Sequence, residues 1–290
     1  MATKITAAMV KQLREMTDSP MMECKKALVE ADGDIDKAVD VLRKMGVAKA
    51  VKRAGRDTNE GTVAAYISED GKKAALLELS CETDFVGTNP KFVGFATKLA
   101  GVVAENNPAD VDALKALPMA ETTVADELTE QIHLFGENMK VLRFVARSTE
   151  NGAFGSYIHN GGKIGVIVEF CFTKPETGAS EEFKTFAHDV ALHVAAVNPI
   201  SARREDVPAE TIEHEMSIYK AQAAESGKPE AIQERIAQGR MEKFYKESVL
   251  TEQEFVKNPD VTVGQLASQV SKSLGDTIEV VKFDRFEFGE

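Results

Sequence analysis

The first 46 residues contain three runs of apolar positions at helical spacing, separated by polar breaks. The apolar positions are Ile5, Met9, Val10 and Leu13; Met21, Met22, Cys24, Ala27 and Leu28; and Ile35, Ala38, Val39 and Leu42, of which the last four are expected to face inward. Ser19 is expected to cap the second helix, with Pro20 at its first position. Asp34 is expected to cap the third helix and Gly46 to end it. The pattern predicts a compact three-helix head, which we assign together with a basic linker to residues 1–55.

After residue 56 the pattern changes to short strands, and it then occurs twice. An offset of 91 aligns residues 61–108 with residues 152–199 without a gap, and fifteen of the forty-eight pairs are identical. Unrelated segments of this composition would share about three. Each copy has the pattern of a strand, a glycine-containing turn, an apolar strand and a helix that ends at Asn-Pro. The repetition predicts an α+β unit present in two copies.

A second internal match, at an offset of 139, pairs residues 136–144 with residues 275–283. Both segments have the pattern of a strand that follows a short helix. Because the offset grows from 91 to 139, about 48 residues must be inserted in the second copy, between roughly 200 and 248. Apolar residues recur there at helical spacing on both sides of a Ser-Gly-Lys-Pro turn at 226–229. This insertion is predicted to be a helical hairpin.

These patterns predict the α+β fold class: a three-helix head, two duplicated α+β subdomains and a helical-hairpin insertion in the second. We expect the first core subdomain at 56–140, the second at 141–200 and 248–290, and the hairpin arm at 201–247. The sequence contains no run of 18 apolar residues, and its amino terminus alternates charged and apolar positions. We therefore expect no membrane segment and no signal peptide, and a cytoplasmic location.

The distribution of charge along the sequence indicates which kind of partner the chain can bind. The net charge is −12, yet residues 1–56 carry twelve Lys or Arg against eight Asp or Glu. An acidic surface repels phosphate backbones, so we expect no direct nucleic-acid partner. The basic amino-terminal segment suits an acidic protein surface. Cys24, Cys81 and Cys171 are scattered without a CxxC motif, which fits reduced thiols in a reducing compartment.

The sequence carries no recognisable catalytic or cofactor motif. It has no GxxxxGK[ST] loop, no GxGxxG turn after a strand, no HExxH and no GxSxG. His188 and His193 lie five residues apart on one predicted helix and face different sides, so we interpret them as surface or capping histidines. Cys81 lies beside Glu82 and Asp84, whose charges disfavour a thiolate. We expect no active site, no cofactor and no metal.

The two copies differ most in the loop after the apolar strand. The first copy has Glu-Thr-Asp-Phe-Val-Gly at 82–87, and the second has Thr-Lys-Pro-Glu-Thr-Gly at 173–178. Such loops lie at the surface, so burial of Phe85 within its own domain is not assured. Alternatively, Phe85 folds back onto the following helix as a hydrophobic staple. The second copy makes its turn without an aromatic residue, which favours a functional role for Phe85.

Four segments together resemble the elongation factor Ts family. They are TDFV at 83–86, SPMMECKKALVEADGDIDKAVDVLRKMG at 19–46, DVALHVAAVNP at 189–199, and SGKP with ERIAQGRMEKFYKE at 226–247. Their order matches as well, and the resemblance covers essentially the whole chain. It implies a ubiquitin-associated-like head, two related core subdomains and a protruding helical hairpin.

The resemblance implies a translation elongation factor that acts as a guanine nucleotide exchange factor and has no chemistry of its own. Its partner would be the GTPase elongation factor Tu in the GDP form. In the family, the TDFV segment wedges between two helices of the GTPase domain and dislocates Mg²⁺, so that GDP leaves and GTP can bind. The residues that carry over are Thr83, Asp84, Phe85 and Val86 in the loop, Met21, Met22 and Lys25 in the head, and, with less weight, His193. Alternatively, one of the two methionines belongs to the core of the head, and in that case we expect it to be Met22 rather than Met21.

Two other functions remain as alternatives at this point. A non-enzymatic adaptor could use the head to hold a helical or ubiquitin-like partner, but this leaves TDFV without a role. An enzyme that uses Cys81 with a histidine leaves the duplication and the hairpin without a role. In some relatives the hairpin is a self-association surface, so a homodimer through it stays open. Some relatives also continue into a carboxy-terminal helical module, whose contribution we expect to be missing.

Overall fold

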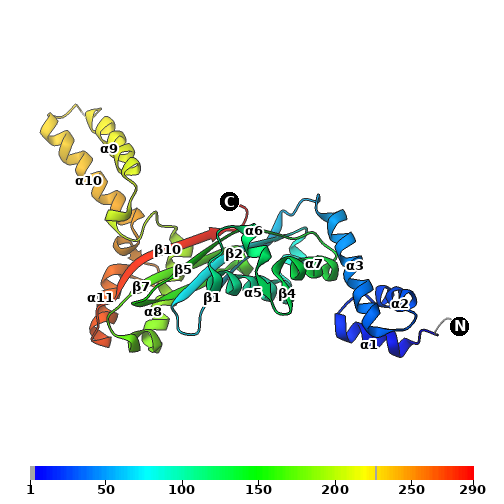
Figure 1. Ribbon diagram of the computed structural model, residues 1–290. Helices are drawn as coiled ribbons and strands as arrows, with labels where there is room; N and C mark the ends of the chain where they lie inside the picture. Colours follow the sequence, from blue (N-terminus) through cyan, green and yellow to red (C-terminus); the bar gives the residue numbers. More distant parts are fainter. Residues whose placement is uncertain (1–3, 226) are drawn as a thin grey trace. The chain divides into compact units, whose positions relative to one another are not determined.

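The computed structural model describes residues 4–225 and 227–290 (Figure 1). Its helices and small antiparallel sheets agree with the predicted α+β class. The chain divides into two compact units. Unit 1 consists mainly of Met1–Thr62 and Leu77–Phe144, and unit 2 of Val63–Leu76 and Val145–Phe288. Ser226, the first residue of the predicted hairpin turn, lies outside the described residues.

Unit 1 begins with three helices, as predicted: α1 (Ala7–Thr17), α2 (Met21–Glu30) and α3 (Ile35–Arg53). The side chains of Thr6 and Asp34 accept hydrogen bonds from backbone N–H groups in the first turns of α1 and α3. The three helices enclose one apolar cluster, formed by Val10, Leu13, Cys24, Ala27, Leu28, Ala31, Ala38 and Leu42. Burial of this small core holds the three helices together, since α1 and α2, with 11 and 10 residues, are too short to be stable alone.

Two details predicted for the head are wrong. The hydroxyl of Ser19 donates to the carbonyl of Thr17, and Pro20 occupies the N-cap position of α2 without a side-chain cap. Gly46 does not end α3, which continues to Arg53. A Cβ at Gly46 would lie 3.3 Å from Cβ of His133, so the missing side chain lets a later helix of unit 1 pack closely. This close packing offsets the low helix propensity of glycine.

The elements of the first sequence copy follow, most of them in unit 1 and parts of three strands in unit 2. They are β1 (Glu60–Ile67), β2 (Lys73–Cys81), α4 (Asp84–Gly87), α5 (Pro90–Asn106), α6 (Val111–Ala116), β3 (Pro118–Met119), β4 (Thr122–Thr123), α7 (Val124–Phe135) and β5 (Lys140–Ser148). Strands β1, β2 and β5 form a sheet with β2 in the middle, and the chain crosses between the two units within β1, β2 and β5. The apolar face of α5 is buried through Phe92, Phe95, Leu99 and Val103.

Unit 2 contains the elements of the second copy. They are β6 (Gly152–His159), η1 (Asn160–Gly162), β7 (Ile164–Cys171), η2 (Pro175–Ala179), α8 (Glu181–Val197), η3 (Arg204–Asp206), η4 (Leu250–Glu252), β8 (Glu254–Phe255), β9 (Asn258–Thr262), α11 (Val263–Leu274) and β10 (Glu279–Glu287). β7 lies between β6 and β10, antiparallel to both. α8 packs on β6 and β7, and the rings of Phe170, Phe183 and Phe186 meet in this layer.

The elements recur at the two offsets found in the sequence. α5 and α8 each have 17 residues, and each ends at an asparagine in the left-handed conformation, Asn107 and Asn198. α7 and α11 each have 12 residues, begin with a threonine capping box and end at a left-handed glycine, Gly136 or Gly275. The strand order β1-β2-β5 in one sheet corresponds to β6-β7-β10 in the other.

The predicted hairpin consists of α9 (Ala209–Ala224) and α10 (Glu230–Ser248), which lie side by side and project from the rest of unit 2 (Figure 1). Arg204 holds the base of α10. Its guanidinium forms paired hydrogen bonds with the carboxylates of Glu252 and Glu242, and it lies 4.4 Å from the ring centre of Tyr245. The hydrogen bonds to Glu252 and then Glu242 raise the pKa of Arg204 above its ordinary value.

The base of the hairpin should therefore depend on Arg204. We expect Arg204→Ala to lower the free energy of unfolding by about 1 kcal/mol, because a branched network in partial contact with solvent contributes at the upper end of the surface range. Arg203→Ala is the matched control, since Arg203 pairs with Glu205 and Asp206 of its own turn. Urea denaturation measures the free energy of unfolding of both variants. An equal decrease for Arg203→Ala and Arg204→Ala would contradict the role assigned to Arg204.

Candidate functional site

The loop at 82–87 connects β2 with α5 and contains one turn of helix, α4, where the sequence predicted only a loop. Oγ1 of Thr83 caps this turn by accepting a hydrogen bond from the N–H of Val86 at 3.4 Å. At the other end, the hydroxyl of Thr88 donates to the carbonyl of Asp84 at 2.8 Å. The first cap is a side chain of the loop itself, and the second belongs to the residue that follows it.

Phe85 is 84% exposed, the largest exposed fraction among the described large hydrophobic side chains. The alternative in which it folds back onto the following helix is therefore wrong. Asp84 is exposed as well, and Thr83 and Val86 are half-buried. Water around an exposed aromatic ring is unfavourable, so this position is suited to burial in another molecule. The loop brings three predicted site residues, Asp84, Phe85 and Val86, onto one helical turn.

Gly87 lets this turn lie directly on the start of β1. A Cβ at position 87 would come within 3.2–3.3 Å of three backbone atoms of Gly61. Gly87 is buried, so any side chain there would push α4 away from the strand. The close contact between Gly87 and the start of β1 therefore fixes the position of α4 on the surface.

A carboxylate that sequence reasoning missed holds the loop from the side. Oε2 of Glu137 accepts hydrogen bonds from the N–H groups of Glu82 and Thr83, both at 3.0 Å, and its Oε1 accepts from the hydroxyl of Thr83 at 2.6 Å. In return, the carboxylate of Glu82 accepts from the N–H of Asn138 at 2.6 Å and pairs with Arg56 at 3.3 Å. We call the three bonds accepted by Glu137 the loop anchor.

The second copy has the same arrangement without an aromatic residue. Asp276, which the 139-residue offset pairs with Glu137, accepts from the N–H groups of Thr173 and Lys174 and from the hydroxyls of Thr173 and Thr177, at 2.5–3.1 Å. Desolvation opposes ionisation of Asp276, but these hydrogen bonds outweigh it and hold its pKa well below the ordinary value. Exposed Glu176 occupies the place of Phe85. The recurrence of an acid after Gly136 and Gly275 was the sequence signal for the anchor.

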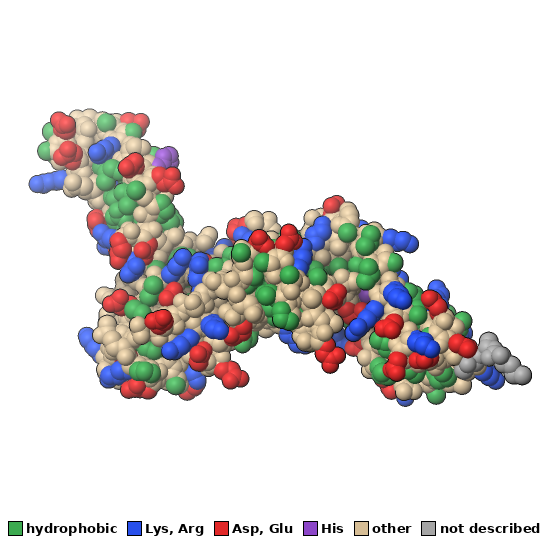
Figure 2. Space-filling model, in the orientation of Figure 1, with side chains coloured by type: hydrophobic (Ala, Val, Ile, Leu, Met, Phe, Trp, Pro, Cys, Tyr) green, Lys and Arg blue, Asp and Glu red, His purple; other side chains and the backbone are tan. Residues whose placement is uncertain are grey.

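The predicted head residues lie on α2, apart from the loop. Met21 is 53% exposed, Met22 is 64% exposed, and Lys25 is exposed too. The prediction that Met22 belongs to the core is therefore wrong, because Cys24, Ala27 and Leu28 fill that side of the helix. Figure 2 shows acidic, basic and apolar side chains interspersed over the visible face of the head. Both methionines are available to a partner.

His193 lies in unit 2 and is fully buried, so its interpretation as a surface or capping histidine is wrong. Its Nδ1 accepts from the N–H of Val256 at 3.2 Å, and its Nε2 lies 3.0 Å from Oε1 of Gln253. These partners require a neutral ring that carries its proton on Nε2. Burial lowers the pKa of His193, and the hydrogen bond to Gln253 opposes this shift only in part. The ring supports the packing of α8 and does not reach the surface.

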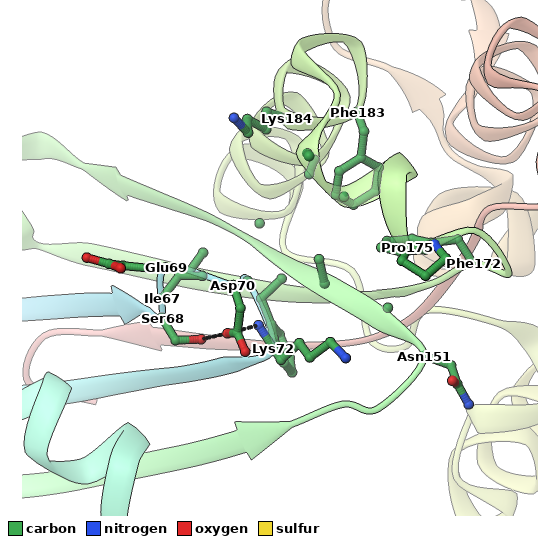
Figure 3. A pocket seen from close by; sticks show the side chains of 18 of the residues that line it. Ile67, Ser68, Glu69, Asp70, Lys72, Asn151, Phe172, Pro175, Phe183 and Lys184 are labelled. Atoms are coloured by element: carbon green, nitrogen blue, oxygen red, sulfur yellow. Dashed lines mark hydrogen bonds between the residues drawn. The ribbon is translucent and has the colours of Figure 1, made fainter.

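A groove of unit 2 has a volume of about 510 Å³ and is drawn in Figure 3. Asp70 points along it, but the carboxylate already accepts from the hydroxyl of Ser68 and the N–H of Lys72. Phe172, Pro175 and Phe183 form its apolar side (Figure 3). The polar groups of Ser68, Asp70 and Lys72 are thus hydrogen-bonded to one another within the β1–β2 turn. In a typical cofactor site, such groups instead converge on the ligand.

Two of the three cysteines, Cys24 and Cys81, are buried. Cys81 is fully buried, and its Sγ lies 3.1 Å from the carbonyl oxygen of Thr83. Burial raises the pKa of the Cys24 thiol. Among residues 4–225 and 227–290, no group of three or more His, Cys, Asp or Glu side chains is arranged to hold a metal ion. No described helix is both long and apolar enough to cross a bilayer.

The neutral state of His193 predicts how stability depends on pH. Because the pKa of His193 is lowered in the folded chain, the unfolded chain takes up the proton first as the pH falls below about 6.5. Stability should fall through this range, by at most about 1.4 kcal/mol per pH unit for one proton. Urea denaturation at pH 7.5 and 5.5 measures it. His193→Gln should show a smaller difference between the two pH values, and an unchanged difference would contradict the prediction.

Comparisons with known proteins agree with the resemblance seen in the sequence. The family profile described as "Elongation factor TS" matches residues 82–290. An elongation factor Ts from Trichlorobacter lovleyi is 47% identical over 289 residues, which cover 99% of this chain and 93% of that protein. An elongation factor Ts from Clostridium perfringens is 46% identical over 287 residues, with the same coverage of both chains. The chain therefore belongs to the elongation factor Ts family.

Proposed function

We propose that the chain is a guanine nucleotide exchange factor for the translational GTPase elongation factor Tu. It binds the GDP form of the partner, dislocates Mg²⁺ and promotes GDP release so that GTP can bind. The observation that carries the proposal is the exposure of Phe85, at 84%, on a helical turn held by side-chain caps and by the loop anchor. Family membership supports the role in translation.

The proposed mechanism needs only Phe85 and its neighbours. The ring of Phe85 leaves water and enters a gap between two helices of the partner, and the helix arrangement that opens this gap is thereby favoured. Asp84, next to it, brings a carboxylate that rearranges the polar groups supporting Mg²⁺. Thr83 and Val86 hold the turn that carries both. If the chain binds the nucleotide-free partner more tightly, GDP must bind the complex more weakly by the same factor.

The remaining residues contribute contact area. Met21 and Met22 offer flexible apolar side chains to the GTPase domain, and Lys25 offers a positive charge to an acidic group there. His193 contributes indirectly, through the packing of the helix in which it is buried. The chain itself holds no nucleotide, metal or cofactor and forms no covalent bond with substrate. We place this activity in the cytoplasm, where translation occurs.

The proposed domain organisation follows the predicted boundaries. A ubiquitin-associated-like head and linker occupies 1–55, the first core subdomain 56–140, and the second 141–200 and 248–290, with the hairpin arm at 201–247. The recurrence of helix lengths, caps and strand order at the two offsets supports an origin of the core by duplication. Under this proposal only the first copy carries the wedge.

The proposal predicts a specific effect of removing the ring. Phe85→Ala should slow stimulated release of fluorescent GDP from purified elongation factor Tu by at least about tenfold, as expected for a buried aromatic anchor. Its urea denaturation curve should be unchanged, because the ring is exposed in the free chain. Glu176→Ala, at the aligned position of the second copy, is the matched control and should release GDP normally. A wild-type chain that does not stimulate release would overturn the function, and normal release by Phe85→Ala would overturn the wedge.

A further inference from the structure

The orientation of Phe85 cannot come from packing of its own side chain, because the residue is 84% exposed. It must come from the backbone of the 82–87 loop. α4 has four residues, and a helix of one turn is not stable alone in water, since nucleation fixes many dihedral angles for few hydrogen bonds. Contacts from outside the loop are therefore required to keep the turn formed.

We propose that Glu137 is the positioning residue that presents Phe85 to the partner; this inference rests on the proposed function. One carboxylate satisfies two successive backbone N–H groups, of Glu82 and Thr83, and the hydroxyl of Thr83. Oγ1 of Thr83 in turn accepts from the N–H of Val86. Hydrogen bonds thus run without interruption from Glu137 through Thr83 to the turn that carries Phe85, and bonds to a charged acceptor are the strong kind.

The segment after α7 fixes the loop from a second direction. The N–H of Asn138 donates to the carboxylate of Glu82, and Nδ2 of buried Asn138 donates to the carbonyl of Arg56 at 2.9 Å and to that of Ala54 at 3.4 Å. Residues 137 and 138 therefore hold both the loop and the chain that leaves α3. Because these partners lie 54 to 84 residues apart in sequence, the anchor depends on the folded unit and not on local propensity.

The corresponding carboxylate of the second copy, Asp276, makes it possible to distinguish a positioning role of Glu137 from a purely structural one. Asp276 makes the corresponding bonds to Thr173 and Lys174, yet the loop it holds carries Glu176 and no aromatic side chain. Loss of either anchor removes similar hydrogen bonds from its own subdomain. Only loss of the Glu137 anchor should change how Phe85 is presented. Asp276→Asn is therefore the matched control for Glu137→Gln.

Glu137→Gln replaces the charged carboxylate by a neutral amide with a single acceptor oxygen, so the three donors of the loop no longer share a charged acceptor. The loop should then sample several conformations, of which a fraction is able to bind. Apparent affinity falls by that fraction, whereas the rate within the assembled complex does not. We expect the concentration of chain that gives half-maximal GDP release to rise about tenfold, with the maximal rate within about twofold of wild type. Glu137→Asp should stay within about threefold, because an aspartate makes the same bonds in the second copy.

The test combines GDP release from elongation factor Tu with amide hydrogen exchange in the free chain. Glu137→Gln should speed exchange at residues 82–88 by about tenfold, and Asp276→Asn should leave it unchanged there. Placed on Phe85→Ala, Glu137→Gln should cost less than about twofold further, since removal of the ring already abolishes the main contact that the anchor positions. A merely structural role would instead give losses that multiply.

Three results of the GDP-release assay would overturn the inference: a wild-type half-maximal concentration for Glu137→Gln, an equal shift for Asp276→Asn, or a full tenfold loss on the Phe85→Ala background. Failure of the proposed function gives a different result, because the wild-type chain would then not stimulate GDP release from elongation factor Tu at any concentration. Hydrogen exchange requires no partner, so unchanged exchange at residues 82–88 in Glu137→Gln overturns the inference in either case.

Discussion

The carboxylate of Glu137 accepts three hydrogen bonds from the loop that carries Phe85, and the proposed action of the chain depends on them. An exposed phenylalanine gains its binding energy only when it leaves water, so nothing in the free chain orients it except its backbone. Thr83 links the anchor to α4, and Gly87 sets the turn against β1. Together these contacts convert a loop into a rigid support, which lowers the entropy lost on binding.

The two copies of the core make this arrangement easier to interpret. Both have an acid after the left-handed glycine that ends a 12-residue helix, and both use it to hold the loop that leaves the central strand. The difference lies in what the loop presents, Phe85 in one copy and Glu176 in the other. The same anchor thus occurs twice in the chain, and in our account function arises in the copy whose loop presents an aromatic residue. No catalytic group is needed for that function, since a change in relative affinity for two states of a partner is sufficient.

Much of the fold could be predicted because its signals are local or periodic. The offsets of 91 and 139 located recurring strands and helices, and apolar spacing located the three helices of the head. The errors came from tertiary contacts. Gly46 was read as a helix end, but packing against His133 keeps it inside α3, and Met22 was assigned to a core that Cys24, Ala27 and Leu28 already fill. His193 was read as exposed, although Gln253 and Val256 enclose it. Glu137 was missed because its partners are 54 and 55 residues away.

The central claim concerns relative affinity, so the most direct measurement is the dissociation constant of the chain for elongation factor Tu with Mg²⁺ and GDP and for the nucleotide-free protein, by titration calorimetry. The account predicts that the wild-type chain binds the nucleotide-free form more tightly by at least about tenfold. It also predicts that Phe85→Ala loses most of this ratio, chiefly by weaker binding to the nucleotide-free form. Equal affinity of the wild-type chain for both forms, or an equal loss for both forms in Phe85→Ala, would contradict the account.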